Sequence, residues 1–206
     1  MALVVVVGWG SSVGAWSTGA GGDPNWGSTT FGGTNSDRAY GGVAVDGSGN
    51  VYTTGAFSGT VNFGAGNVTA AGNIDVFVTK LNSSGAHQWT TTFGGTNNAF
   101  SWGVAVDGSG NVHVTGHFDE TVDFGAGNVT SAGNTDVFVT KLNSSGVHQW
   151  TTTFGAAGPN AADSGYGLAV DGSGNVHVTG HFSGTVNFGA GNVTAAGGPD
   201  AFVTKL

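Results

Sequence analysis

The first candidate for ligand chemistry is a pentapeptide, DGSGN, which occurs three times and begins at Asp46, Asp107 and Asp171. In the first copy, Asp46, Ser48 and Asn50 have the spacing of the first three ligands of a calcium loop. The rest of such a loop is missing, because its sixth position is Val51 instead of Gly and its twelfth is Phe57 instead of Glu. The pentapeptide therefore predicts an Asx-type hairpin turn and no metal site.

Paired histidines are the second candidate. His113 and His117 are four residues apart in one copy of the surrounding sequence, and His177 and His181 are four apart in another. On a strand, such residues share a face but stand ~13 Å apart, whereas a metal ion needs nitrogens at about 2 Å. We expect these side chains to pack between repeat units or to be exposed.

Groups that could serve catalysis are scarce. Gly10–Gly14 (GSSVG) matches the nucleophile-elbow pattern, but no helical pattern follows it, as that motif requires. Asp119, Glu120 and Asp123 cluster in one copy only, and the other copies offer no second carboxyl group for glycoside hydrolysis. The sequence predicts no enzymatic activity, no catalytic residue, no metal and no cofactor.

The composition favours an all-β protein. Its 206 residues include 41 Gly, 13 Phe, 6 Trp and no Cys, with 12 acidic and 4 basic side chains and a net charge of −8. This apolar supply argues against disorder, and the charge argues against nucleic acid as a partner. The longest unbroken apolar run, Ala2 to Val7, is far too short for a membrane helix.

Internal repetition organises the chain. Asp46, Asp107 and Asp171 are 61 and 64 residues apart, and the segments DVFVTKL, DVFVTKL and DAFVTKL recur with the same spacings. The three additional residues fall in GAAGPNAADSG (155–165), which we interpret as a loop insertion. Each repeat is predicted to form four strands: GVAVD (a), the strand after DGSGN (b), DVFVTKL (c) and HQWTTTFG (d). Four antiparallel strands in about 60 residues are typical of a propeller blade.

These motifs resemble the bacterial β-propeller repeat family called SBBP. Its members carry a GxAVDxxGNVYVTG hairpin followed by DAFVxKLxxxG, which correspond here to Gly42–Gly55, Gly103–Gly116 and Gly167–Gly180 with the strand-c segments that follow them. The resemblance covers roughly Trp26 to Leu206. It implies a propeller-type fold and an extracellular or cell-surface location.

The order of strands predicts an incomplete ring. We divide the chain into an N-terminal extension (1–25), with a short apolar strand at Leu3–Val7, and a propeller-like domain (26–206). The domain consists of a strand d at 26–33 and repeats at roughly 40–95, 101–155 and 165–206. Three blades are too few for a ring, and the last repeat lacks strand d.

We therefore expect the N-terminal strand d of a neighbouring subunit to complete the last blade. Head-to-tail exchange of this kind would give a six-bladed ring as a dimer, or a filament. The residues assigned to this assembly are Trp26, Thr29, Phe31, Phe202, Thr204 and Leu206.

Two functions follow as hypotheses. The first is a non-enzymatic extracellular structural protein whose partner is itself. The alternative is a lectin-like module that binds glycans through aromatic residues expected in loops on one propeller face: Tyr40, Phe100, Trp102 and Tyr166. In a purely structural interpretation, these rings fill gaps between blades. Glycosylation sequons also recur, at Asn67, Asn128 and Asn192.

Overall fold

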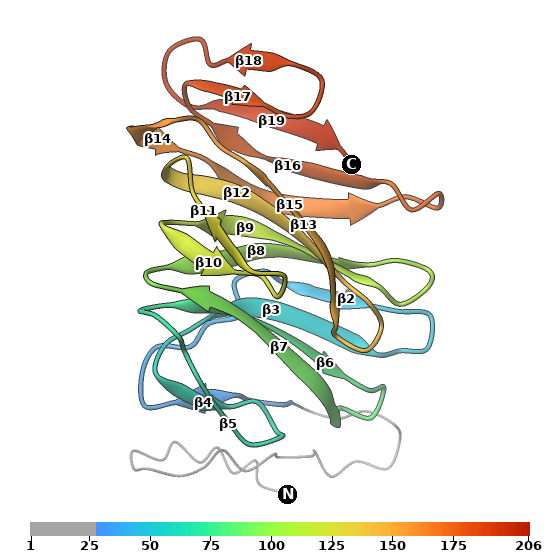
Figure 1. Cartoon of the computed structure of the whole chain (residues 1–206). Helices are drawn as coiled ribbons and strands as arrows, with labels where there is room; N and C mark the ends of the chain where they lie inside the picture. The colour runs from blue at the N-terminus through green and yellow to red at the C-terminus, as the bar shows by residue number, and fades with distance from the viewer. Residues whose placement is uncertain (1–27) are drawn as a thin grey trace, which may run out of the picture.

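The computed structural model describes residues 28–206, and all regular structure within this range is β-strand. The strands form antiparallel sheets that follow one another along the long axis of the molecule (Figure 1). The N-terminal extension (1–25), with the predicted strand Leu3–Val7 and the Gly10–Gly14 motif, lies outside the described residues, as does Trp26 of the predicted strand d.

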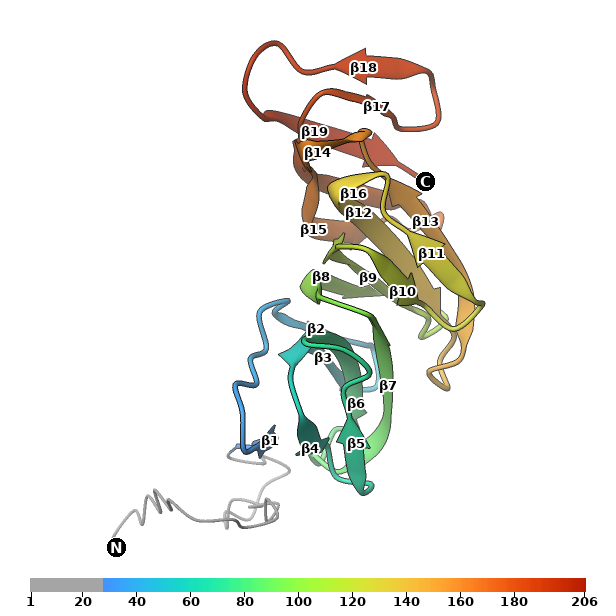
Figure 2. The same ribbon diagram turned by 60° about the vertical axis from the view of Figure 1, so that its left-hand side comes forward.

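The first sheet contains a repeat unit in the predicted order a–b–c–d, which we call unit 1. Its strands are β2 (Val43–Val45), β3 (Val51–Phe57), β6 (Asp75–Leu81) and β7 (His87–Gly95). A small hairpin between β3 and β6 consists of β4 (Thr60–Asn62) and β5 (Asn67–Thr69). It pairs with β1 (Gly32–Gly33), the first described strand (Figure 2).

Unit 2 repeats this arrangement. It contains β8 (Ala99–Val106), β9 (Val112–Phe118), β12 (Gly133–Leu142) and β13 (His148–Phe154), with the hairpin β10 (Thr121–Asp123) and β11 (Asn128–Thr130).

Unit 3 has strands a, b and c among the described residues: β15 (Ser164–Val170), β16 (Val176–Phe182) and β19 (Asp200–Lys205). Its hairpin is β17 (Thr185–Asn187) and β18 (Asn192–Thr194). The segment predicted as a loop insertion instead contains β14 (Gly158–Ala162), which pairs with β12 in parallel. That prediction was wrong because a neighbouring sheet edge offers backbone partners that the local sequence does not reveal.

Each a–b hairpin is closed by the DGSGN turn. In unit 1, Asp46 Oδ1 accepts hydrogen bonds from the backbone N–H groups of Ser48 and Asn50, each at 2.9 Å. Gly49 adopts a φ of 76°, a conformation that most other residues avoid. The predicted Asx-type turn is confirmed.

Neighbouring units pack through valine-rich faces. Val76 and Val78 on β6 share one buried cluster with Val112 and Val114 on β9. At the next junction, Val137 and Val139 on β12 share a cluster with two valines of β16, Val176 and Val178. The period-two alternation of these strands places their small apolar side chains on the face towards the adjacent unit.

A quartet of phenylalanines recurs at every unit. In unit 2, the Phe124 ring lies 5.3 Å from Phe118, 5.0 Å from Phe138 and 5.8 Å from Phe93, which comes from strand d of unit 1. Unit 3 repeats the quartet with Phe154 as the ring from the preceding strand d.

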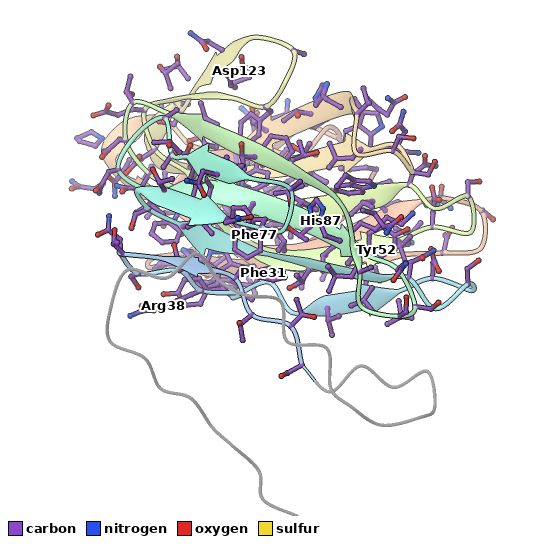
Figure 3. The ribbon with its side chains drawn as sticks, turned by 90° about the horizontal axis from the view of Figure 1, so that it is seen from below. Phe31, Arg38, Tyr52, Phe77, His87 and Asp123 are labelled. Atoms are coloured by element: carbon purple, nitrogen blue, oxygen red, sulfur yellow. The ribbon has the colours of Figure 1, made fainter. Side chains whose placement is uncertain are left out.

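Unit 1 has the same quartet, and the fourth ring is Phe31, 5.8 Å from Phe63 and 6.2 Å from Phe77 (Figure 3). The segment before unit 1 therefore occupies the place that strand d of a preceding unit would take.

Candidate functional site

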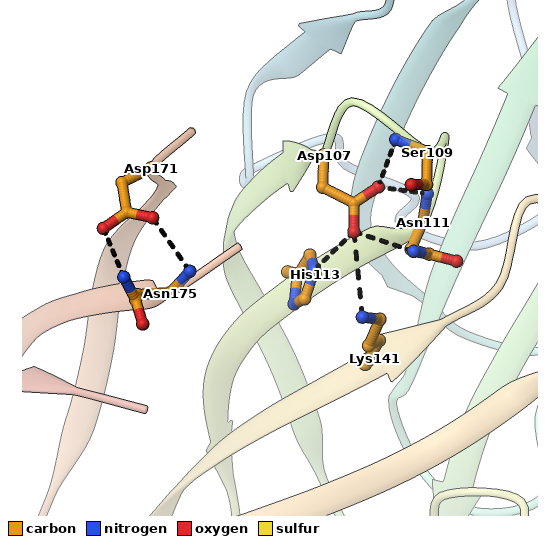
Figure 4. Close-up of polar contacts among 7 residues, drawn as sticks. All are labelled: Asp107, Ser109, Asn111, His113, Lys141, Asp171 and Asn175. Atoms are coloured by element: carbon orange, nitrogen blue, oxygen red, sulfur yellow. Dashed lines mark hydrogen bonds and ion pairs between the residues drawn. The ribbon is translucent and has the colours of Figure 1, made fainter. Parts of the chain in front are cut away.

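The carboxylates of the DGSGN turns are occupied by internal partners. Asp107 accepts from the backbone N–H groups of Ser109 and Asn111 and from the side-chain amide of Asn111, and Lys141 lies 3.7 Å away (Figure 4). Burial raises the pKa of Asp107, but these hydrogen bonds and the Lys141 charge together hold it below its usual value. Within residues 28–206, no three His, Cys, Asp or Glu side chains gather in a way that could hold a metal.

Two members of the acidic cluster, Asp119 and Glu120, make structural contacts. Asp119 accepts a hydrogen bond from the Asn98 backbone N–H at 2.6 Å and from the side-chain amides of Asn97 and Asn98. Glu120 accepts a hydrogen bond from Thr96 at 3.0 Å. These contacts fix the connection between β7 and β8.

The four histidines do not converge. His113 is buried beside Asp107 at 3.6 Å, whereas its counterpart His177 is exposed. His117 Nδ1 lies 3.0 Å from both Trp102 Nε1 and Ser164 Oγ, which belongs to unit 3. Burial lowers the pKa of His117 to about 4, with Asp119 opposing this change and His181 adding to it. Of these four side chains, His117 packs between units 2 and 3.

The four predicted binding aromatics come together in one row along the edge of the stack. Tyr40 lies 5.0 Å from the Trp102 ring and 6.4 Å from Phe100, and Trp102 lies 6.4 Å from Tyr166. We call these residues the aromatic row. It runs through all three units.

The prediction that these aromatics occupy loops was wrong for three of them. Phe100 and Trp102 lie on β8, and Tyr166 lies on β15. Strands β8 and β15 each have a register shift at this point, between Ser101 and Gly103 and between Gly165 and Gly167. Such a bulge redirects a side chain out of its normal alternation, which is how Trp102 and Tyr166 reach the neighbouring units.

The large apolar residues that remain exposed are concentrated on the two end units. Val203 on β19 is 78% exposed, whereas its counterparts Val78 and Val139 are 0% exposed. Val43 and Val45 on β2 are 63% and 59% exposed. We call the Ala201–Val203 side of β19 the rear face, and the side of unit 1 with Val43, Val45, Val51 and Thr53 the front face.

These two faces correspond to the halves of an internal junction. In unit 2 the residues equivalent to the front face are Val104, Val106, Val112 and Val114, and they pack against β6 of unit 1. The rear face is equivalent to those two β6 valines, Val76 and Val78. Each end of the described stack thus presents one half of the same interface.

The backbone of β7 also crosses a junction. It pairs with β6 in its own unit, and its last residues pair with β10 of the next unit in the register Asp123↔Gly94 and Val122↔Gly95. β1 reproduces this second contact on unit 1, with Asn62↔Gly32 and Val61↔Gly33.

The residues assigned to assembly fall on both ends of the stack. Phe202 lies in the buried phenylalanine quartet, Thr204 pairs with Val178, and Leu206 exchanges backbone hydrogen bonds with Val176. Among the described residues, β19 has β16 on one side and no strand on its other edge. At the opposite end, Thr29 and Phe31 are partly buried.

The sequon asparagines occupy equivalent exposed places. Asn67, Asn128 and Asn192 are the first residues of β5, β11 and β18, the outer strands of the three small hairpins. In each hairpin the sequon threonine bonds to a threonine of the partner strand at 2.8 Å. All three asparagine residues are exposed.

Sequence reasoning missed the phenylalanine quartet and Asp163. Asp163 is buried and accepts hydrogen bonds from the backbone N–H groups of Ala156 and Ser183, at 2.8 and 2.7 Å. The recurrence of Phe at four equivalent positions was a visible signal for the quartet. Asp163 lies within the non-repeated insertion, so no comparison between copies could single it out.

Comparison with known proteins identifies the repeat. Residues 88–117 and 149–181 match the family model described as beta-propeller repeat, SBBP. Each matched segment starts on strand d of one unit and ends on strand b of the next, so it spans a junction. The resemblance inferred from the motifs is confirmed.

One relative is an uncharacterized WD repeat-containing protein of Acanthamoeba polyphaga mimivirus. It is 28% identical over 138 residues, which cover 59% of this chain and 9% of the relative. The chain thus spans a small part of the length of this relative. No helix among residues 28–206 is long and apolar enough to cross a membrane.

Proposed function

We propose that this chain of SBBP propeller repeats is a non-enzymatic structural protein whose copies associate head to tail. The rear face of one copy packs on the front face of the next, in the manner of units 1 and 2. The partner is a second copy because the two exposed faces are equivalent to two surfaces that already pack together inside the chain.

The observation that carries this proposal is the pairing of β1. Gly32 and Gly33 make the contact with unit 1 that Gly94 and Gly95 make with unit 2. In β7, the residues before that contact pair with β6, which is strand c of unit 1. By the same arrangement, residues 28–31 of one copy pair with the free edge of β19 in another, and the exposed edge favours such addition.

Burial of apolar surface supplies the stabilisation. Val203, Val43 and Val45 are largely exposed in a single chain, and each buried valine contributes roughly 1.5–3 kcal/mol. Strand pairing adds the register that specifies head-to-tail geometry. Because such contacts are heterologous, they generate closed rings or open filaments. The proposed location outside the cell follows from the resemblance to SBBP proteins.

The test substitutes the rear face. Val203→Asp places a charge where a second copy packs, and should raise the dissociation constant at least about tenfold. Val147→Asp is the matched control, because Val147 is 58% exposed but lies in the β12–β13 turn. Sedimentation velocity of the 206-residue protein measures the oligomeric state, and circular dichroism verifies the fold.

A monomeric wild-type protein at tens of micromolar would exclude the proposal. Equal weakening by both valine substitutions would also contradict it, since only one of them lies on the rear face. A second variant, Thr29→Pro, removes a backbone donor from the segment that pairs with β19 and should weaken association without altering units 1 to 3.

A second function, binding of neutral glycans, is supported by the continuity of the aromatic row. Tyr40 and Tyr166 remain 38% and 51% exposed at its two ends, and aromatic faces stack on the apolar faces of sugars. A glycan array probed with wild-type protein and Tyr166→Ala tests this function. Loss of a wild-type signal in the variant supports it, and absence of any wild-type signal contradicts it.

A further inference from the structure

Tyr166, which is exposed, and His181, which is half-buried, form a ring pair at the rear end of the aromatic row. Their rings are 5.3 Å apart, and Tyr166 is more than half exposed. The equivalent pair in unit 2, Trp102 and His117, is 5.9 Å apart. Unit 3 covers that pair, because Tyr166 packs on Trp102 and Ser164 Oγ lies 3.0 Å from His117 Nδ1.

The strand pairing shows which residue would cover the ring pair of unit 3. Ser164 is directly opposite His181 on β15 and β16, and Phe100 is opposite His117 on β8 and β9. In unit 1 the same place belongs to Arg38, which bridges to Ala56. Arg38, Phe100 and Ser164 are therefore equivalent, and the latter two contact a ring of the preceding unit.

We infer that Tyr166 and His181 are the docking site for the Arg38–Tyr40 segment of a second copy, and that protonation of His181 weakens this contact. The inference rests on the proposed head-to-tail association and identifies a regulatory site within it. The aromatic row then continues from Tyr166 of one copy to Tyr40 of the next.

Charge explains the dependence on protonation. Arg38 is one of only four basic residues in the chain, and it would lie beside His181, so a charged imidazole would face a guanidinium group. Other titratable groups facing His181 are Tyr166 on β15 and His117 on β9, and Asp200 lies opposite the neighbouring Phe182 on β19. His117 shows the effect of coverage, since burial beneath unit 3 lowers its pKa to about 4.

The sign follows from the charge on His181. A positive imidazole beside the Arg38 guanidinium disfavours the assembly, so association should be stronger at pH 7.5 than at pH 5.5, two values that lie on either side of the ordinary range for histidine. The dissociation constant should therefore rise severalfold between pH 7.5 and pH 5.5.

The experiment measures the dissociation constant of the 206-residue protein by sedimentation velocity at pH 7.5 and 5.5. His181→Gln should associate equally at both values, because it retains polarity but cannot be charged. His148→Gln is the matched control, since His148 lies on β13 of unit 2, away from the rear face, and contacts Thr151 of its own strand. It should keep the wild-type pH dependence. Tyr166→Ala should weaken association at pH 7.5.

The outcomes separate this inference from the proposed function. A wild type that is monomeric at both pH values overturns both. Association that is independent of pH, or a His181→Gln protein with the wild-type pH dependence, overturns the inference alone. Unaltered association of Tyr166→Ala at pH 7.5 also excludes docking at this site.

Discussion

At the scale of the residue, the phenylalanine quartets show how one side-chain type joins two units. Each quartet combines three rings of one unit with a ring from the preceding strand d, and the centroid distances differ little between copies. Edge-to-face contacts, such as Phe118 on Phe124 at 87°, favour one relative orientation of the rings. The quartet therefore sets the position of strand d as well as filling the core.

Replacement of the central ring should reveal this role. Phe124 is 1% exposed, so Phe124→Ala should lower the free energy of unfolding by about 3–5 kcal/mol through loss of burial and cavity formation. Phe188→Ala removes the equivalent ring of unit 3, which is only partly buried, and should cost less. Urea unfolding measures both. Equal losses of unfolding free energy in the two variants would mean that coverage by a neighbouring unit adds nothing to the stability that the ring contributes.

At the scale of the element, the DGSGN hairpins derive their register from one carboxylate each. Asp46 binds the backbone and side chain of Asn50, the Ser48 N–H and the Tyr52 hydroxyl. Burial raises the pKa of Asp46, but the combined hydrogen bonds lower it to about 2. The ionised turn is thus the stable form at neutral pH.

This turn should contribute to stability in a pH-dependent way. The folded pKa of Asp46 lies below its model value of 3.8, so its stabilisation is present above about pH 4 and is lost as the pH falls towards 2. Asp46→Ala should therefore destabilise the protein at pH 6 by about 1 kcal/mol or less, given its exposure to solvent. The difference from wild type should nearly vanish at pH 2.

Urea titrations at the two pH values measure this difference. Ser48→Ala is the control, because Ser48 bonds to Asp46 through its backbone N–H. It should show no such convergence with wild type. A constant deficit of Asp46→Ala at both values would contradict the account.

At the scale of the whole molecule, the faces at the two ends of the stack are less buried than the equivalent faces of the middle unit. In the 136–142 segment of β12 every residue except Lys141 is buried, whereas in the equivalent β19 only Phe202 is buried. A central unit has a neighbour on both faces, and the end units lack one among the described residues (Figures 1 and 2). Local stability should follow this difference.

Hydrogen–deuterium exchange should report association at both ends together. In dilute protein, amides of β19 should exchange faster than those of β12. At high concentration, β19 and residues 28–31 should become protected in parallel, because one strand pairs with the other. Protection of β19 alone would argue for a different occupant of its edge.

The sequence by itself determined the units of this protein. DGSGN turns, alternating valines and the DVFVTKL segments are local signals, since hydrogen bonds within a turn and the period of a strand involve neighbouring residues. Strand order within each unit could therefore be predicted, as could the four aromatics that the structure gathers into one row.

Only the tertiary structure decided how the units meet. The bulges that expel Trp102 and Tyr166, the parallel pairing of β14 with β12, and the shared strand β7 all depend on partners from another unit. Such contacts leave no period in the local sequence, because they are specified by the surface of a neighbour that folding brings close.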